Sequence, residues 1–117
     1  MKVTRIVDHE QTDLWLDGAE RVRMRMLIGP EDGANTFHMR HFEVEPGGHT
    51  PHHQHNYEHE ALVLKGQGVM KSASGDLPFQ AGYVVWVPAN EKHQFQNTGG
   101  ERLEIICLIP APQRSPL

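Results

Sequence analysis

Cysteine is almost absent from this chain of 117 residues, in which Cys107 is the only one. A single thiol excludes a disulfide within the chain, and it also excludes a zinc site built from paired thiolates. Any metal site formed by one copy of the chain therefore has to rely on nitrogen or oxygen ligands. The length is that of one compact domain, and we expect residues 1–117 to form a single one.

Long apolar runs and runs of basic residues are missing as well. The longest apolar stretch is IICLI at 105–109, and acidic residues occupy the N-terminal segment where a secretory signal needs an apolar core. The formal charge is -4, with 11 basic residues scattered among 15 acidic ones. A surface that follows a phosphate backbone is not indicated. We therefore expect a cytoplasmic protein that spans no membrane and binds no nucleic acid.

Long segments free of turn residues are also scarce. Gly, Pro and Asp-Gly or Ser-Gly pairs divide the chain into segments that are short for helices and suited to strands. Alternation at 21–26 and at 37–44 predicts strands with one exposed face. The apolar runs 61–64 and 83–87 predict strands buried on both faces, and 102–109 completes the series. Such a series predicts an all-β sandwich or closed barrel.

The two ends of the chain carry weaker signals. Short helical turns are expected near Glu10 to Leu16 and nowhere else. Residues 111–117 contain two of the three prolines near the C-terminus, and we expect them to form a loose tail.

Histidine is the residue in surplus. The chain has nine, and seven of them lie between residues 38 and 59. His53, His55 and His59 share parity, so an extended backbone would place all three on one face, with Glu58 and Glu60 on the other. Three neutral imidazoles facing one cavity suit a borderline divalent ion such as Zn, Mn, Fe, Ni or Cu. Buried without a metal, each unpaired imidazole would cost about 1–3 kcal/mol. Structural roles are expected for His9, His38, His41 and His49.

A second pattern overlaps this cluster. Residues 55–59 match the H-x-x-E-H motif of inverted zinc metallopeptidases, in which a helix presents both histidines. The surrounding segments predict strands instead of a helix, so we disfavour a peptidase.

Two longer motifs resemble those of the cupin family. The segment 46–66 resembles the first cupin motif, and 82–97 resembles the second, about 15 residues later. The matching positions are Gly47, His53, His55 and Gly66 in the first motif and Gly82, Pro88, His93 and Asn97 in the second. The resemblance covers roughly residues 20–110. It implies a small single-domain cupin, an all-β jelly-roll barrel also called a double-stranded β-helix.

The sequence departs from the cupin pattern at two positions. Asn90 stands where the second motif usually has Gly, and Asn tolerates the left-handed backbone that such a turn requires. His59 stands where the family's three-residue spacing places a Glu, while Glu60 fits the four-residue spacing and is the rival ligand. The resemblance, with the parity above, favours an all-histidine site for one divalent transition metal ion per chain, manganese among the candidates. Its expected ligands are His53, His55, His59 and His93.

What the site does is left open by the family. Four neutral ligands leave the ion's full charge in place and make it a stronger Lewis acid. The resemblance implies a metal-dependent enzyme, foremost a dioxygenase that cleaves an enolisable or flavonol-like small molecule. A non-redox isomerase or decarboxylase, or a non-catalytic binding or sensor module, would use the same site.

The sequence also suggests roles for a few residues around the site. Phe95 shares parity with His93 and is a candidate wall of the substrate pocket, although core packing would explain it equally well. Trp86, Met39 and Cys107 are expected in the core. By resemblance, we expect a homodimer that pairs through an edge strand.

Overall fold

The computed structural model of the chain describes residues 1–111, so the expected loose tail lies outside the described residues apart from Ala111. These residues form nine strands and two short 3-10 helices. The elements are η1 (Ile6–Asp8), β1 (Thr12–Asp13), β2 (Glu20–Ile28), η2 (Pro30–Asp32), β3 (Phe37–His49), β4 (His59–Lys65), β5 (Gln67–Ser72), β6 (Gly75–Gln80), β7 (Val84–Val87), β8 (Gln94–Asn97) and β9 (Leu103–Pro110). Neither helix is long and apolar enough to cross a bilayer.

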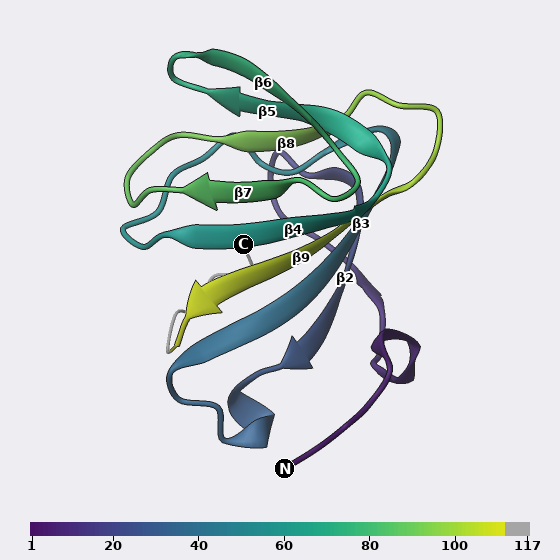
Figure 1. The fold of residues 1–117 in the computed structure, drawn as a ribbon, viewed down its shortest axis with the longest axis vertical. Coiled ribbons are helices and arrows are strands. Elements are labelled where there is room, and N and C mark those ends of the chain that lie inside the picture. Colours follow the sequence, from purple (N-terminus) through teal and green to yellow (C-terminus); the bar gives the residue numbers. More distant parts are fainter. Residues whose placement is uncertain (112–117) are drawn as a thin grey trace.

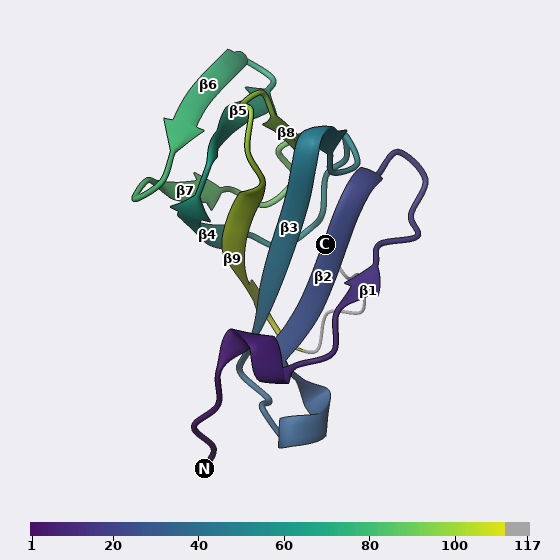
Figure 2. The same cartoon turned by 90° about the vertical axis from the view of Figure 1, so that its right-hand side faces the viewer.

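The strands belong to one antiparallel sheet that curls around an interior (Figures 1 and 2). Its main path runs β6-β5-β8-β3-β9-β4-β7, and β2 and β1 extend it from β3. The long pairing of β3 with β9 joins Phe37 to Pro110 and Val44 to Leu103. This arrangement confirms the expected all-β jelly-roll fold.

The interior is filled by alternate side chains of the curled sheet. In β9, every second residue from Leu103 to Ile109 is buried, as period-2 geometry requires. Full burial of a large apolar side chain stabilises the fold by about 1.5–3 kcal/mol. The buried cluster consists of Val22, Phe42, Val44, Ala61, Val63, Met70, Phe79, Val87, Phe95, Leu103, Ile105 and Cys107.

The prediction of two-sided burial for 61–64 and 83–87 is wrong. Leu62 and Leu64 are each 41% exposed, and Val84 and Trp86 are 80% and 64% exposed. β4 and β7 are neighbours in the sheet, and their outer face has no second layer over it among the described residues. Trp86 is thus not a core residue, whereas Cys107 is fully buried and Met39 is half-buried.

Two local expectations near the N-terminus also need correction. The helical turns expected near residues 10–16 are absent there, because Leu14 donates its N–H to Val22 and β1 pairs with β2. In β2 the strand is as expected, but an irregularity in the pairing turns Leu27 inward and leaves Met26 37% exposed.

Left-handed turns set the entry and exit of the strands around the site. Asn90 has φ 66, which confirms that asparagine replaces the usual glycine in a left-handed position. Gly66 has φ 88, and a Cβ there would lie 2.8 Å from the carbonyl oxygen of Arg102. Only glycine fits at that crossing of chain segments.

Candidate metal centre

The segment between β3 and β4, residues 50–58, carries the first histidines of the site. His53 is joined to His93 by an isolated antiparallel bridge, with N···O distances of 3.1 and 2.9 Å. Asn90 donates its N–H to the carbonyl of His55 at 2.6 Å. These backbone bonds hold the two histidine-bearing segments together although they lie far apart in the chain.

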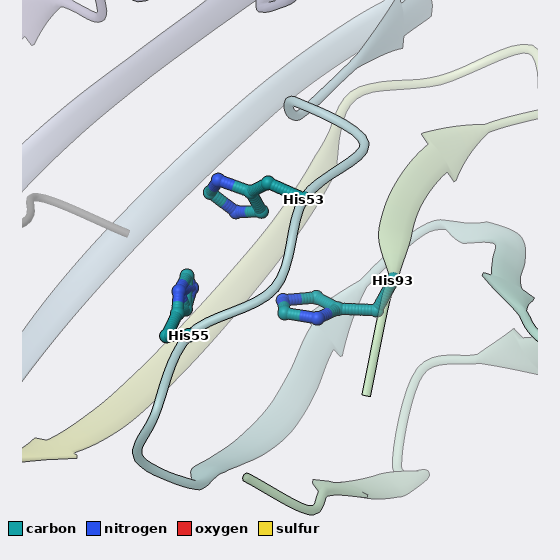
Figure 3. Close-up of side chains that lie close together, drawn as sticks. All are labelled: His53, His55 and His93. Atoms are coloured by element: carbon teal, nitrogen blue, oxygen red, sulfur yellow. The ribbon is translucent and has the colours of Figure 1, made fainter. Parts of the chain in front are cut away.

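Three imidazoles converge at this junction (Figure 3). His53, His55 and His93 each offer a ring nitrogen, and these nitrogens lie within 4.8 Å of one another. The ring centroids are 4.3 Å apart for His53 and His55, 5.2 Å for His55 and His93, and 5.3 Å for His53 and His93. The structure thus brings three of the four expected ligands together.

The fourth expected ligand, His59, begins β4 beside this group. Its ring is 2% exposed and stacks on His55 with centroids 4.5 Å apart, and its centroid is 5.3 Å from that of His93. Its ring nitrogens are not part of the 4.8 Å group. The rival Glu60 is exposed on the outer face of β4, paired across the strands with Trp86. We call His53, His55, His59 and His93 the interior site.

The hydrogen bonds of these rings leave particular nitrogens without partners. Nδ1–H of His93 donates to the Glu91 carbonyl at 2.9 Å, and Nδ1 of His59 contacts Sγ of Cys107 at 3.3 Å. Among the described residues, Nε2 of His55 and Nε2 of His59 are buried with no hydrogen-bond partner. A ligated ring that bonds through its other nitrogen is the usual arrangement at metal sites, so the donor set fits a bound ion.

The four imidazoles are neutral at pH 7. Burial is the main cause, and it lowers the pKa of His53 and His55 to about 4, helped by neighbouring histidines. Burial also lowers the pKa of His59 to about 2, with the charge of Arg40 adding to the effect, and it lowers the pKa of His93. Neutral rings keep the lone pairs that a metal ion requires.

A small cavity of about 10 Å³ adjoins the rings. This is room for about one water molecule or ion. Phe95 is buried, lines this cavity and also packs edge-on against Phe79 at 6.0 Å. The lining residues are Phe42, Thr50, His53, His59, His93, Phe95, Ile105 and Cys107.

Two residues beside the site, Arg40 and Tyr57, were not predicted from the sequence. Arg40 of β3 lies opposite Cys107 of β9, with Nη2 3.6 Å from Sγ. Tyr57 stacks on His55 with centroids 4.7 Å apart and planes 4° apart. The parity of Arg40 with the inward Phe42 would have revealed its direction. Nothing in the sequence pairs residues 40 and 107.

The remaining histidines bond locally or face solvent. Their described contacts are His9 with Thr4, His38 with the carbonyl of Ala34, His41 with Glu104 and His49 with the carbonyl of Thr50, while His52 is exposed.

A second group of ligand-type side chains lies on the opposite face of β3 and β9. We call His41, Glu43 and Glu104 the outer cluster, and their ligand atoms also lie within 4.8 Å of one another. His41 Nε2 is 3.0 Å from Glu104 Oε1, and Glu43 accepts from Gln11 Nε2 at 2.7 Å. Arg23, Arg25 and Arg102 lie 3.5, 3.5 and 3.8 Å from the Glu43 carboxylate.

A family model described as a cupin domain matches residues 40–109. Among curated proteins, the chain is 33% identical over 84 residues to a 1-methylthio-D-xylulose 5-phosphate methylsulfurylase from Rhodospirillum rubrum, covering 69% of this chain and 52% of that protein. It is 34% identical over 76 residues to Auxin-binding protein 1 from Arabidopsis thaliana, covering 57% of this chain and 38% of that protein. The chain therefore spans about half or less of these two relatives. An oxalate-binding protein from Thermotoga maritima is 31% identical over 94 residues, with 79% of this chain and 78% of that protein covered.

Solved structures match over almost the whole chain. The polyketide cyclase RemF from Streptomyces resistomycificus has a TM-score of 0.88 and 30% identity, covering 100% of this chain and 86% of that one. A predicted oxalate decarboxylase from Thermotoga maritima has a TM-score of 0.85 and 26% identity, covering 93% and 98%.

Proposed function

The chain belongs to the cupin family, and from that premise we propose that it is a metal-dependent enzyme that binds and polarises an enolisable carbonyl compound. One observation carries the proposal: the buried Nε2 atoms of His55 and His59 have no partner among the described residues. Leaving two such acceptors unpaired costs about 1–3 kcal/mol each, and a bound ion removes that cost.

We assign the ion to the interior site, with His53, His55, His59 and His93 as ligands. A divalent transition metal bound there supplies Lewis-acid polarisation of a carbonyl oxygen. Cys107 fixes the ring of His59, and the Glu91 carbonyl fixes the ring of His93. The apolar side chains of Phe42, Phe95 and Ile105 keep water from this wall of the site.

The site favours a substrate that is already acidic. Glu58 and Glu60 are both exposed, and Glu58 accepts a hydrogen bond from the Trp86 indole on the outer face. No carboxylate joins the interior group among residues 1–111. A β-dicarbonyl loses its proton far more readily than a simple ketone, so it needs less help from a protein base.

Ring closure of a poly-β-carbonyl compound without a change of oxidation state is the reaction that we favour. Support comes from the similarity to a polyketide cyclase over the full length of the chain. Dioxygen-dependent cleavage of the same class of compound is the second candidate, because a four-imidazole ligand set suits redox-active metals as well as zinc. Binding without turnover is the third, because two of the three curated relatives described above are named as binding proteins.

The metal is tested by elemental analysis of protein purified without added ions. We expect about one transition metal ion per chain, and we expect its loss in the double variant His55→Ala/His93→Ala. The matched control is His52→Ala, which removes an exposed histidine from the same segment and leaves the metal content unchanged. Full occupancy in the double variant would overturn the proposal.

The chemistry is tested with acetylacetone and with linear triketones, by following the enol absorbance together with dissolved oxygen. Loss of the enol signal without oxygen uptake supports cyclisation or a related non-redox reaction. Stoichiometric oxygen uptake would instead indicate a dioxygenase. Saturable binding without turnover would indicate a binding protein. Absence of both binding and turnover for every β-dicarbonyl would contradict the assigned substrate class.

We also propose that two copies pair through the outer face of β4 and β7. β7 ends the path of the sheet among the described strands, and the face carries Leu62, Leu64, Val84 and Trp86 in exposed positions. Contiguous exposed apolar side chains of this kind are typical of an interface. Light scattering after size exclusion should give twice the mass of the 13.3 kDa chain, and Trp86→Glu should give the single mass. A monomer at micromolar concentration would contradict the pairing.

A further inference from the structure

Arg40 is a fully buried arginine whose charge is not matched by the protein. Its exposed fraction is 0%. Nε and Nη1 are buried and, within residues 1–111, have no hydrogen-bond partner. These two nitrogens carry three of the five N–H donors of the guanidinium group. Burying a charge without a partner is among the costliest arrangements in a protein interior.

The contacts that Arg40 does make leave its charge uncompensated. Nη2 donates to Sγ of Cys107 at 3.6 Å, and Cζ lies 5.1 Å from the centre of the Phe42 ring. Burial raises the pKa of the Cys107 thiol, so the sulfur remains neutral and is not a counterion. The ion pairs between described residues involve other arginines, such as Arg23 and Arg102.

A second unpartnered donor lies close to the same place. The hydroxyl of Tyr57 is buried with no hydrogen-bond partner among the described residues. The Tyr57 ring stacks on His55 at 4.7 Å, and Cys107 contacts both Arg40 and, through Nδ1, His59. Arg40 is thus linked to the interior site through Cys107 and His59, and Tyr57 is linked to it through His55.

We propose that Arg40 and Tyr57 form an anion-binding subsite next to the interior site, and that the substrate carries a carboxylate in addition to its enolisable carbonyl. The second half rests on the proposed function, and the first does not. A carboxylate accepts charge-assisted hydrogen bonds from guanidinium N–H groups, which are about twice as strong as neutral ones. The Tyr57 hydroxyl donates one more. A carboxylate bound here would give partners to donors that the described residues leave unpaired.

Two small ligands separate the carboxylate from the carbonyl chemistry. Acetoacetate and acetylacetone are of similar size and share an enolisable ketone, but acetoacetate has a carboxylate where acetylacetone has its second ketone. By calorimetry at pH 7, with zinc-loaded and with metal-free protein, we expect acetoacetate to bind about tenfold or more tightly than acetylacetone. Arg40→Met should remove this preference, and Tyr57→Phe should reduce it severalfold. Arg5→Met, an exposed change of the same charge, should leave it intact.

Thermal unfolding distinguishes a ligand-binding arginine from a structural one. Methionine fills similar space without a charge, so Arg40→Met should leave the unfolding temperature of the ligand-free protein unchanged or raise it. The same variant should lose the rise in unfolding temperature that acetoacetate gives the unmodified protein. A lower unfolding temperature combined with unaltered acetoacetate affinity would overturn the subsite.

The outcomes also separate the subsite from the proposed function. If metal and acetylacetone bind but acetoacetate binds no more tightly, the subsite is wrong and the proposed function stands. If no metal binds while acetoacetate binding still depends on Arg40, the proposed function is wrong and the anion-binding subsite stands.

Discussion

Three residues of the interior site, His53, His55 and His93, and the three residues of the outer cluster each bring their ligand atoms within 4.8 Å of one another. The two groups lie on opposite faces of the curled sheet. In the outer cluster the carboxylate acceptors already have partners. Glu43 accepts a hydrogen bond from Gln11 and lies near three arginines, and Glu104 accepts a hydrogen bond from His41. Only Nδ1 of His41 is buried there without a partner among the described residues. In the interior site, Nε2 of His55 and of His59 have none.

The two groups also differ in the direction of their electrostatics. Burial opposes ionisation of Glu43, but the hydrogen bond from Gln11 and the charges of Arg102 and Arg23 outweigh it, so its pKa is lowered and the carboxylate is charged. In the interior site, burial acts on bases and keeps them neutral. Spacing alone therefore does not identify a metal site. The two groups differ in their unpaired buried ring nitrogens, of which, among the described residues, the interior site has two and the outer cluster has one.

The largest difference between the two groups should appear on metal addition. At a free ion concentration about 1,000 times the dissociation constant, binding stabilises the native state by about 4 kcal/mol. We therefore expect added metal to raise the thermal unfolding temperature of the unmodified protein. It should not raise that of His55→Ala/His93→Ala. The variant His41→Gln, in the outer cluster, should keep the full rise. If only His41→Gln lost this rise in unfolding temperature, the ion would bind at the outer cluster and our assignment to the interior site would be wrong.

Removing the outer carboxylate should affect stability and leave metal binding intact. Glu43→Gln deprives Arg23, Arg25 and Arg102 of their shared partner, and hydrogen bonds to charged groups contribute about 1.5–3 kcal/mol. Urea unfolding should show a loss of that size, with an unchanged metal-to-protein ratio. An unchanged midpoint would mean that the outer cluster does not stabilise the fold.

Lowering the pH should destabilise the metal-free protein through the interior site. The pKa of these histidines is near 6.5 in the unfolded chain and lower in the native state. The unfolded state therefore binds more protons below pH 6.5, and stability falls as pH decreases toward 4. Between pH 7 and pH 5.5 we expect a loss of about 1 kcal/mol from His59, whose native pKa is lowered to about 2, and a further loss from His93, whose pKa is also lowered. Urea titrations at several pH values should show that the free energy of unfolding depends less steeply on pH in His55→Ala/His93→Ala than in the unmodified protein. Parallel pH profiles would contradict the neutral state of the rings.

The smallest effect is expected at a histidine that is adjacent in sequence but exposed. His52→Ala should change the free energy of unfolding by less than about 0.5 kcal/mol, as is usual for surface substitutions. Metal content and the pH profile should also stay the same. A measurable loss of metal in this variant would mean that the segment 50–58 rearranges around the ion.

Much of the fold was predictable because it depends on short-range periodicity. The alternation at 37–44 and the segment 102–109 that completes the series both predicted strands, and residues 37–44 pair with residues 103–110 in the structure. The burial of the apolar runs was not predictable in the same way. Val84 and Trp86 lie on a sheet face that nothing covers among the described residues, and an apolar run does not reveal how many layers a fold has.

The candidate site was predictable where its residues lie in motifs and not where they meet across the sheet. Parity grouped His53, His55 and His59, and the cupin spacing added His93. Arg40 and Cys107 face each other only because β3 and β9 pair in one particular register. Such a contact, 67 residues apart in the chain, has no local signature. The cytoplasmic location rests on composition alone and stays a prediction.

The Cys107 thiol can report local opening of the protein around the interior site. The thiol is 2% exposed, lies between Arg40 and His59, and has a pKa raised by burial. A thiol reagent can reach it only during an opening event that separates the strands around the interior. Since there is no other cysteine, the rate of alkylation under native conditions reports the population of that open form when reclosing is faster than alkylation. Ligands that bind in the interior and stabilise the closed form should slow the labelling of Cys107. Ligands that bind only at the surface should not.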